Sequence, residues 1–175
     1  MAQTVYDPPV STYIPLQTIT LGSAASSVTF ASIPQTYRDL VLIFTPAVTG
    51  GSSSTASSYI RLNGDSGSNY SHVVARGDGS STGSTSFTDT GIDTRYYTNS
   101  PGSLGASITQ VQFLDYSATD KHKSVLSRGN TAASGVNMTA ARWANTAAIT
   151  SIQIVAPSGR SWLTGATLSL YGIEA

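Results

Sequence analysis

The chain has 175 residues and a formal net charge of zero at pH 7, with nine basic and nine acidic residues. Its length suits one domain that buries about 70% of the surface exposed by the unfolded chain. Only 10% of the residues are charged, well below the usual proportion, while 28 Ser, 23 Thr and 16 Gly favour strands and turns. Zero net charge gives no long-range attraction for nucleic acid or a membrane, and the lack of cysteine excludes disulfides and thiolate chemistry.

The N-terminal segment combines proline with tyrosine, at Tyr6, Pro8, Pro9, Tyr13 and Pro15. Proline has no backbone N–H and restricts the residue before it, so this segment should form an extended arm outside any central strand. The arm either anchors the chain to a neighbouring subunit, or it crosses the protein's own surface or is a frayed terminus. We place the arm at residues 1–15 and the folded domain at residues 16–175.

After the arm, short β-like runs alternate with Gly, Ser, Asn and Pro turns, which predicts an all-β, two-sheet antiparallel sandwich of jelly-roll type. Residues 40–44 are continuously apolar and should be buried on both faces, whereas residues 110–114 alternate and should have one wet face. Thr49–Ser58 and Gly77–Ser86 lack apolar anchors and are expected to be mobile, exposed loops. About eleven strands are expected, at Leu16–Leu21, Ser27–Ala31, Asp39–Pro46, Ser57–Asn63, Asn69–Arg76, Ser86–Tyr96, Ser103–Tyr116, His122–Arg128, Val136–Trp143, Ile149–Ala156 and Ala166–Ile173.

The segment from Asn63 to Asn69 has side-chain oxygens at alternate positions, as calcium-binding loops do. It lacks the glutamate that closes such loops with both carboxylate oxygens. Asn-Gly followed by Asp is also a hairpin signal, in which Gly64 and Gly67 would supply positive φ angles. We interpret the segment as a turn, and no metal or other cofactor is expected.

Two further motifs are interpreted as local structure. Arg76-Gly77-Asp78 lies at a predicted strand end and should form a turn with a local Arg/Asp pair. Lys121-His122-Lys123 is the densest basic cluster and could follow a phosphate backbone. Because Asp115 and Asp120 nearly balance its charge, it is more simply a solvated strand end or an intersubunit ion pair, and no nucleic-acid partner is expected.

Catalytic chemistry has few candidates in this chain. Only His72 and His122 supply imidazole, and the carboxylates are eight Asp and Glu174. The sequence contains no Gly-x-Ser-x-Gly elbow, no His-Glu-x-x-His and no phosphate-cradling glycine loop. A polysaccharide depolymerase would need a carboxylate pair in a cleft. We therefore expect a protein that is not an enzyme.

Aromatic residues are the candidates for a sugar-binding or subunit-contact surface. Trp143 precedes a turn and is best interpreted as a cap on the core. Trp162 lies in the loop between Pro157 and Thr164, where a core plug and a recognition residue are equally consistent with the sequence. The candidate recognition surface consists of Trp162, Arg160, Tyr96 and Tyr97.

Three segments carry a family resemblance: residues 17–30 (QTITLGSAASSVTF), residues 63–71 (NGDSGSNYS) and the strand-turn-strand region 143–173. Together they resemble small structural proteins of tailed-phage virions, of the type found in marine and cyanobacterial phages. The resemblance runs from about Leu16 to Ile173 and consists of turns and strands. It implies a virion protein made in a host cytoplasm, with capsid or tail subunits as partners and a homotrimer or other homo-oligomer as its state.

Within that class we expect a non-enzymatic capsid decoration or cement protein, which stabilises a particle by burying area across subunit joints. The alternative is a receptor- or carbohydrate-binding head of a tail fibre or baseplate, with a surface glycan as ligand. The chain's start lacks the basic and apolar regions of a secretory signal, and no run is long enough to span a membrane, so no membrane partner is expected.

Overall fold

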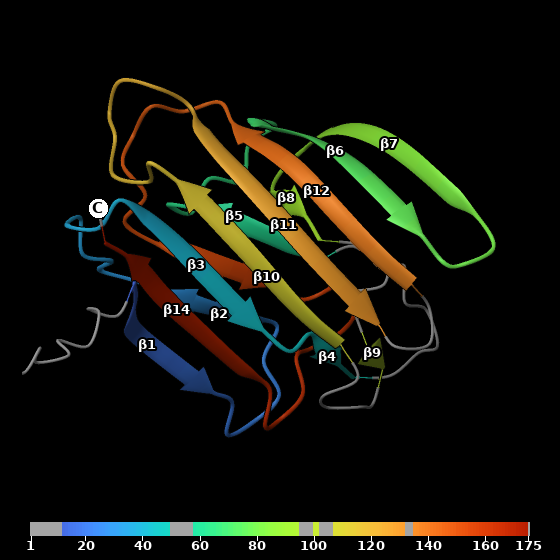
Figure 1. The fold of residues 1–175 in the computed structure, drawn as a ribbon. Coiled ribbons are helices and arrows are strands. Elements are labelled where there is room, and N and C mark those ends of the chain that lie inside the picture. Colours follow the sequence, from blue (N-terminus) through green and yellow to red (C-terminus); the bar gives the residue numbers. More distant parts are fainter. Residues whose placement is uncertain (1–11, 50–57, 95–99, 102–106, 132–134, 175) are drawn as a thin grey trace, which may run out of the picture.

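The computed structural model describes residues 12–49, 58–94, 100–101, 107–131 and 135–174, which form strands, turns and bends without a helix. Two antiparallel sheets pack face to face, which confirms the predicted two-sheet antiparallel sandwich (Figure 1). The described part of the chain therefore contains no helix that could cross a membrane. The predicted arm residues Tyr6, Pro8 and Pro9 lie outside the described ranges.

The larger sheet has eight strands and the smaller has four. The order of the larger sheet is β1 (Tyr13–Thr20), β14 (Thr167–Ile173), β3 (Asp39–Phe44), β10 (Ser107–Leu114), β11 (Lys123–Thr131), β12 (Gly135–Trp143), β6 (Tyr70–Gly77) and β7 (Thr82–Asp89). The order of the smaller sheet is β2 (Ser27–Phe30), β13 (Ile152–Val155), β5 (Tyr59–Leu62) and β8 (Ile92–Asp93). Two short parallel strands, β4 (Ala47–Val48) and β9 (Ser100–Pro101), form a separate pair.

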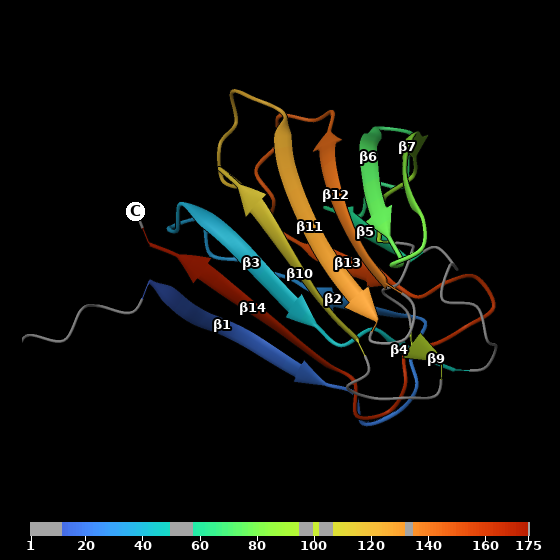
Figure 2. The same cartoon turned by 45° about the vertical axis from the view of Figure 1, so that its right-hand side comes forward.

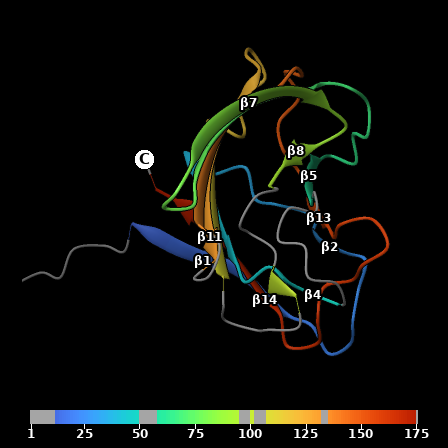
Figure 3. The same cartoon turned by 90° about the vertical axis from the view of Figure 1, so that its right-hand side faces the viewer.

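The smaller sheet covers one face of the larger sheet and leaves the other uncovered by any described residue. Figure 2 shows β2, β13 and β5 behind the larger sheet, and Figure 3 shows the larger sheet nearly edge-on with β7 arching over toward β8. Side chains alternate between the two faces of each strand, so Val111 and Phe113 of β10 face the core while Gln110 and Gln112 face outward. We call the uncovered surface the outer face.

Strand β3 is buried on both sides, as its continuous apolar run predicts. Leu40, Leu42 and Phe44 are buried on the inner side, and the outward-facing Val41 is only 1% exposed. Its cross-strand neighbours are Gln112 on β10 and Tyr171 on β14. Because β3 is central, side chains of both neighbouring strands flank Val41.

Both tryptophans belong to the core. The Trp143 ring stacks on Tyr70 with centroids 6.3 Å apart, which agrees with the interpretation of Trp143 as a cap. Trp162 is 2% exposed and meets the Phe44 ring edge-on at 6.2 Å. Its indole N–H donates to the carbonyl of Ile154 at 3.2 Å. The candidate recognition role of Trp162 was therefore wrong.

The physical reason is that the Trp162 backbone is held on two sides, by isolated bridges to Ala25 and to Val48. The loop is consequently drawn into the sandwich rather than displayed. Its neighbour Arg160 is partly exposed. Tyr96 and Tyr97 lie outside the described residues, so the four candidate residues do not form one described surface.

The predicted boundary between arm and domain is too late in the chain. Tyr13 and Pro15 were assigned to the arm, but both belong to β1, where Tyr13 pairs with Ile173 and Pro15 with Tyr171. Strand β1 is an edge strand, and its register shifts between Pro15 and Gln17. An edge with a bulge tolerates a residue without an N–H, which is why proline does not exclude this strand.

The predicted mobile loop at Gly77–Ser86 was also wrong. Strands β6 and β7 form a hairpin in which Gly77 pairs with Thr82 and His72 with Phe87. Six of the eight residues of β7 are Ser, Thr or Gly, so the strand is held mainly by its backbone ladder with β6, with Phe87 packing against His72. The other predicted loop, Thr49–Ser58, lies almost wholly outside the described residues.

We predict that Trp162→Ala and Phe44→Ala destabilise the domain to a similar degree, by about 3–5 kcal/mol each, because both remove a buried aromatic and leave a cavity. Chemical denaturation of the two variants, followed by tryptophan fluorescence and circular dichroism, measures the loss. If Trp162→Ala unfolds at the same denaturant concentration as the wild type while Phe44→Ala does not, the assignment of Trp162 to the core is incorrect.

Candidate functional site

The Asn63–Asn69 segment is a structural turn, because its polar groups already have partners within the protein. Both Asn63 and Gly64 have positive φ angles, and the Asp65 N–H donates to the Leu62 carbonyl at 3.0 Å. This is the Asn-Gly hairpin turn that the sequence predicts. Gly67, which was expected to need a positive φ, does not have one.

The Asp65 carboxylate accepts three kinds of N–H donor. Its Oδ2 accepts from the Trp143 indole at 2.7 Å and from the Asn69 amide at 2.9 Å, and its Oδ1 accepts from the Gly67 backbone at 2.8 Å. The Trp143 hydrogen bond is the main cause that lowers the pKa of Asp65 below its usual value. The carboxylate thus joins the turn to β12 rather than presenting its oxygens to a cation.

The Arg76-Gly77-Asp78 motif was predicted to form a turn, but Arg76 and Gly77 end strand β6 and pair with β7, and Asp78 alone belongs to the turn between the two strands. The Asp78 carboxylate accepts hydrogen bonds from the backbone N–H groups of Ser80 and Ser81, at 2.9 and 2.7 Å, and from both hydroxyls. These bonds hold the pKa of Asp78 well below its usual range. The side chain of Asp78 therefore closes the hairpin.

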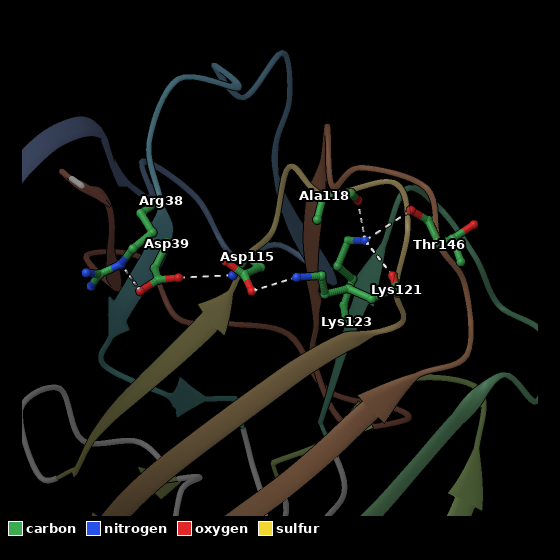
Figure 4. A network of polar contacts seen from close by, with 7 residues as sticks. All are labelled: Arg38, Asp39, Asp115, Ala118, Lys121, Lys123 and Thr146. Atoms are coloured by element: carbon green, nitrogen blue, oxygen red, sulfur yellow. Dashed lines mark hydrogen bonds and ion pairs between the residues drawn. The ribbon is translucent and has the colours of Figure 1, made fainter.

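The two lysines of the basic cluster have different environments (Figure 4). Lys121 is exposed and its ammonium lies 3.2 Å from the Asp115 carboxylate. Lys123 is buried, and its ammonium donates to the carbonyls of Ala118, Lys121 and Thr146 at 2.6, 3.1 and 3.1 Å. Burial lowers the pKa of Lys123. The predicted solvated strand end fits Lys121, which precedes β11 and is exposed, but not Lys123, which faces inward and is buried.

The candidate catalytic groups remain dispersed. His72 is buried beside Phe87, with ring centroids 5.3 Å apart, while His122 is exposed in the turn before β11. The described residues contain no group of three or more His, Asp or Glu side chains that could hold a metal ion. Asp39 is buried and engaged by the Arg38 guanidinium and the Asp115 N–H, both at 3.0 Å.

The most unusual feature of the surface is the outer face of the larger sheet. Every large hydrophobic side chain that is exposed among the described residues lies on this sheet at an outward position, with 38% to 58% exposure. These side chains are Tyr13, Val73, Ile108, Leu114, Leu126, Val136 and Met138. The gathering of all these exposed apolar side chains on one sheet face favours an interaction surface there.

At the centre of the outer face, apolar side chains point outward and polar side chains point into the sandwich. On β11 and β12, Leu126 and Met138 point outward, while Ser127 and Thr139 are buried on the inner side. The register is fixed toward the other end of these strands, where Val125, Ala141 and Trp143 are apolar and buried on the inner side. A slip of one residue would exchange the faces, so the outward apolar residues are a consequence of that register.

Shallow hollows cover much of the outer face. One of about 550 Å³ lies over β12, β6 and β7 and is lined by Val73, Ser86 and Arg142 among others. A second, of about 510 Å³, is lined by Ile108, Val136 and Met138 with polar neighbours. A third, of about 230 Å³, adjoins it. The face therefore offers depressions into which side chains of a partner could insert.

The outer face carries two arginines, Arg128 and Arg142. Neither has an ion pair within the described part of the chain. Arg128 donates from Nε and Nη2 to the Gln110 side-chain oxygen, at 3.2 and 2.6 Å. Of the outward positions on the strands from β3 to β7, Asp39 is the one carboxylate among the described residues, and it is buried at the start of β3.

The outer face was not predicted from the sequence. Residues 110–114 have one wet face, as predicted, but no prediction was made for the outward Ile, Leu, Val and Met residues of the larger sheet. The signal was present as Met138 and Leu126 alternating with Thr139 and Ser127, but alternation alone does not say which of two half-polar faces is buried.

The comparisons with known proteins identify no family. No family model matches the chain, and no curated protein matches it. Among solved structures, it is similar to the crystal structure of scytalido-glutamic peptidase with a transition state analog inhibitor. The two are 14% identical over 84% of this chain and 75% of that chain, with a TM-score of 0.32. This level of similarity carries no argument about activity.

We predict that Lys123→Met destabilises the domain by about 1–3 kcal/mol, because three buried carbonyls lose their common donor. The matched control is Lys121→Met, which removes one exposed, solvent-screened ion pair and should change stability far less. Urea denaturation of both variants measures the difference. Equal stability of the two variants would contradict the structural role of Lys123.

Proposed function

We propose that this chain is a non-enzymatic structural protein of a tailed-phage virion, a decoration or cement protein that binds across joints between capsid subunits. The observation that carries the proposal is the outer face, where the exposed apolar side chains of the described residues are gathered on one broad sheet. A cement protein needs such a surface, since it acts by burying area against its neighbours.

Two further observations support the proposal. The near full-length resemblance in the sequence points to virion proteins. The near-neutral, Ser/Thr-rich composition suits a protein that ends in a dense assembly, because zero net charge gives little repulsion between copies. On this proposal the chain is localised in the virion after synthesis in the host cytoplasm, and its partners are capsid subunits and further copies of itself.

The rival function is a receptor- or carbohydrate-binding head of a tail fibre or baseplate. That function would use aromatic side chains to stack on sugar rings. Both tryptophans are buried, and the exposed outer face carries aliphatic residues and Met138 at its centre. This composition is better suited to a protein surface than to a sugar, so we retain the decoration protein as the leading proposal.

Copy number in the purified particle separates the two functions. A symmetric shell repeats each subunit joint many times, so a decoration protein should be present at on the order of hundreds of copies, against tens at most for a tail tip. Quantitative mass spectrometry of gradient-purified virions, with the major capsid protein as the internal standard, measures this ratio. A count in the tens would favour the tail, and absence from the particle would refute a virion role.

A further inference from the structure

Arg128 occupies the centre of the outer face. It lies on β11 between Gln110 of β10 and Met138 of β12, each directly paired with it across the ladder. Ile43 and Ala75 continue the same row on β3 and β6. The row therefore spans five strands, with one guanidinium in the middle and apolar side chains toward both ends.

The guanidinium is held in place and has donors to spare. Its Nε and Nη2 donate to Gln110 at 3.2 and 2.6 Å, which fixes the plane of the group. An arginine has five N–H donors, so three remain for a partner. Both the 510 Å³ and the 230 Å³ hollows are lined by Gln110, Arg128 and Met138, so Arg128 stands between two depressions.

We propose that the outer face binds a capsid subunit that presents a carboxylate to Arg128 from within an apolar surface, and that it does not bind a second copy of this chain. The inference rests on the proposed function and identifies the surface and partner through which it would act. Arginine surrounded by apolar side chains is common at the energetic centre of protein interfaces, and both arginine and methionine are enriched in interfaces.

Charge complementarity favours a capsid subunit over a second copy of this chain as the partner of the outer face. Burying Arg128 without an anion would be costly, whereas a carboxylate accepts from it through two parallel hydrogen bonds. A second copy, docked outer face to outer face, would bring Arg128 and Arg142 against another surface that carries arginines. Among the described residues of the strands from β3 to β7, the one carboxylate at an outward position is Asp39, which is buried and already bound by Arg38 and Asp115. The face is therefore not complementary to itself.

The available area is sufficient for a stable complex. Six strands at a spacing of about 4.8 Å, each about eight residues long at about 3.4 Å per residue, form a face on the order of 800 Å². A standard protein–protein interface buries about 800 Å² on each partner. The part of the outer face from β3 to β7 alone reaches that size, without the strands β14 and β1.

The test is competitive assembly. Wild type and one variant are expressed at equal levels during infection by a phage lacking its own copy, and their ratio in purified virions is divided by their ratio in the lysate. We expect Arg128→Gln to be depleted in virions about tenfold or more, because the partner's buried carboxylate would lose its ion pair. Arg128→Glu should be depleted further, because it places two carboxylates against each other. The matched control, Lys121→Gln, removes an exposed cation beyond the end of β10 and should assemble like the wild type. Thermal melts of each isolated variant verify that it is folded.

Each outcome has a distinct meaning. If the wild type enters virions and Arg128→Gln enters equally well, the carboxylate partner is overturned while the proposed function stands. If the wild type is absent from virions, the proposed function fails and the partner named here fails with it. A dimer of the isolated wild-type chain in analytical ultracentrifugation that Met138→Glu dissociates would show that the face pairs with a second copy and would also overturn the inference.

Discussion

The fixed register of β10, β11, β12 and β6 is the constraint on which the rest of the molecule depends. Side chains alternate along these strands, so placing Phe113, Val125 and Trp143 in the core determines where every other residue of the four strands points. The smaller sheet covers the inner side. The same register places Leu126 and Met138 on the outer side, where nothing in the described part of the chain covers them.

Polar groups at the loop ends hold the two sheets in this arrangement. The Tyr70 hydroxyl, on the larger sheet, accepts from the Leu62 N–H of the smaller sheet at 3.0 Å, and burial raises the pKa of Tyr70 to about 12. Asn63 accepts from the N–H groups of Thr150 and Ser151 at 2.8 and 3.1 Å. The conspicuous polar motifs of the sequence are thus used to join elements, and the exposed large apolar side chains gather on the outer face.

The fold could be predicted from the sequence because its signals are local. The apolar run Leu40–Phe44 and the Asn63-Gly64 turn appear in the structure as expected. Strand β7 could not be predicted, because Ser and Thr in an edge strand resemble a loop until the neighbouring backbone is known. The burial of Trp162 could not be predicted either, because it depends on backbone bridges to Ala25 and Val48, which are more than a hundred residues away in the sequence.

The outer face could not be predicted from the sequence for a related reason. The two faces of β11 and β12 have similar hydropathy, and only the rest of the sheet decides which face is buried.

Met138 offers a direct test of whether the outer face is covered in the virion, because it is 54% exposed and is the one methionine beyond the N-terminal residue. The measurement is the rate of Met138 oxidation by hydrogen peroxide, in the isolated chain and in purified virions. Our account predicts rapid oxidation in the isolated chain and strong protection in the virion, whereas oxidation at the same rate in both would contradict it.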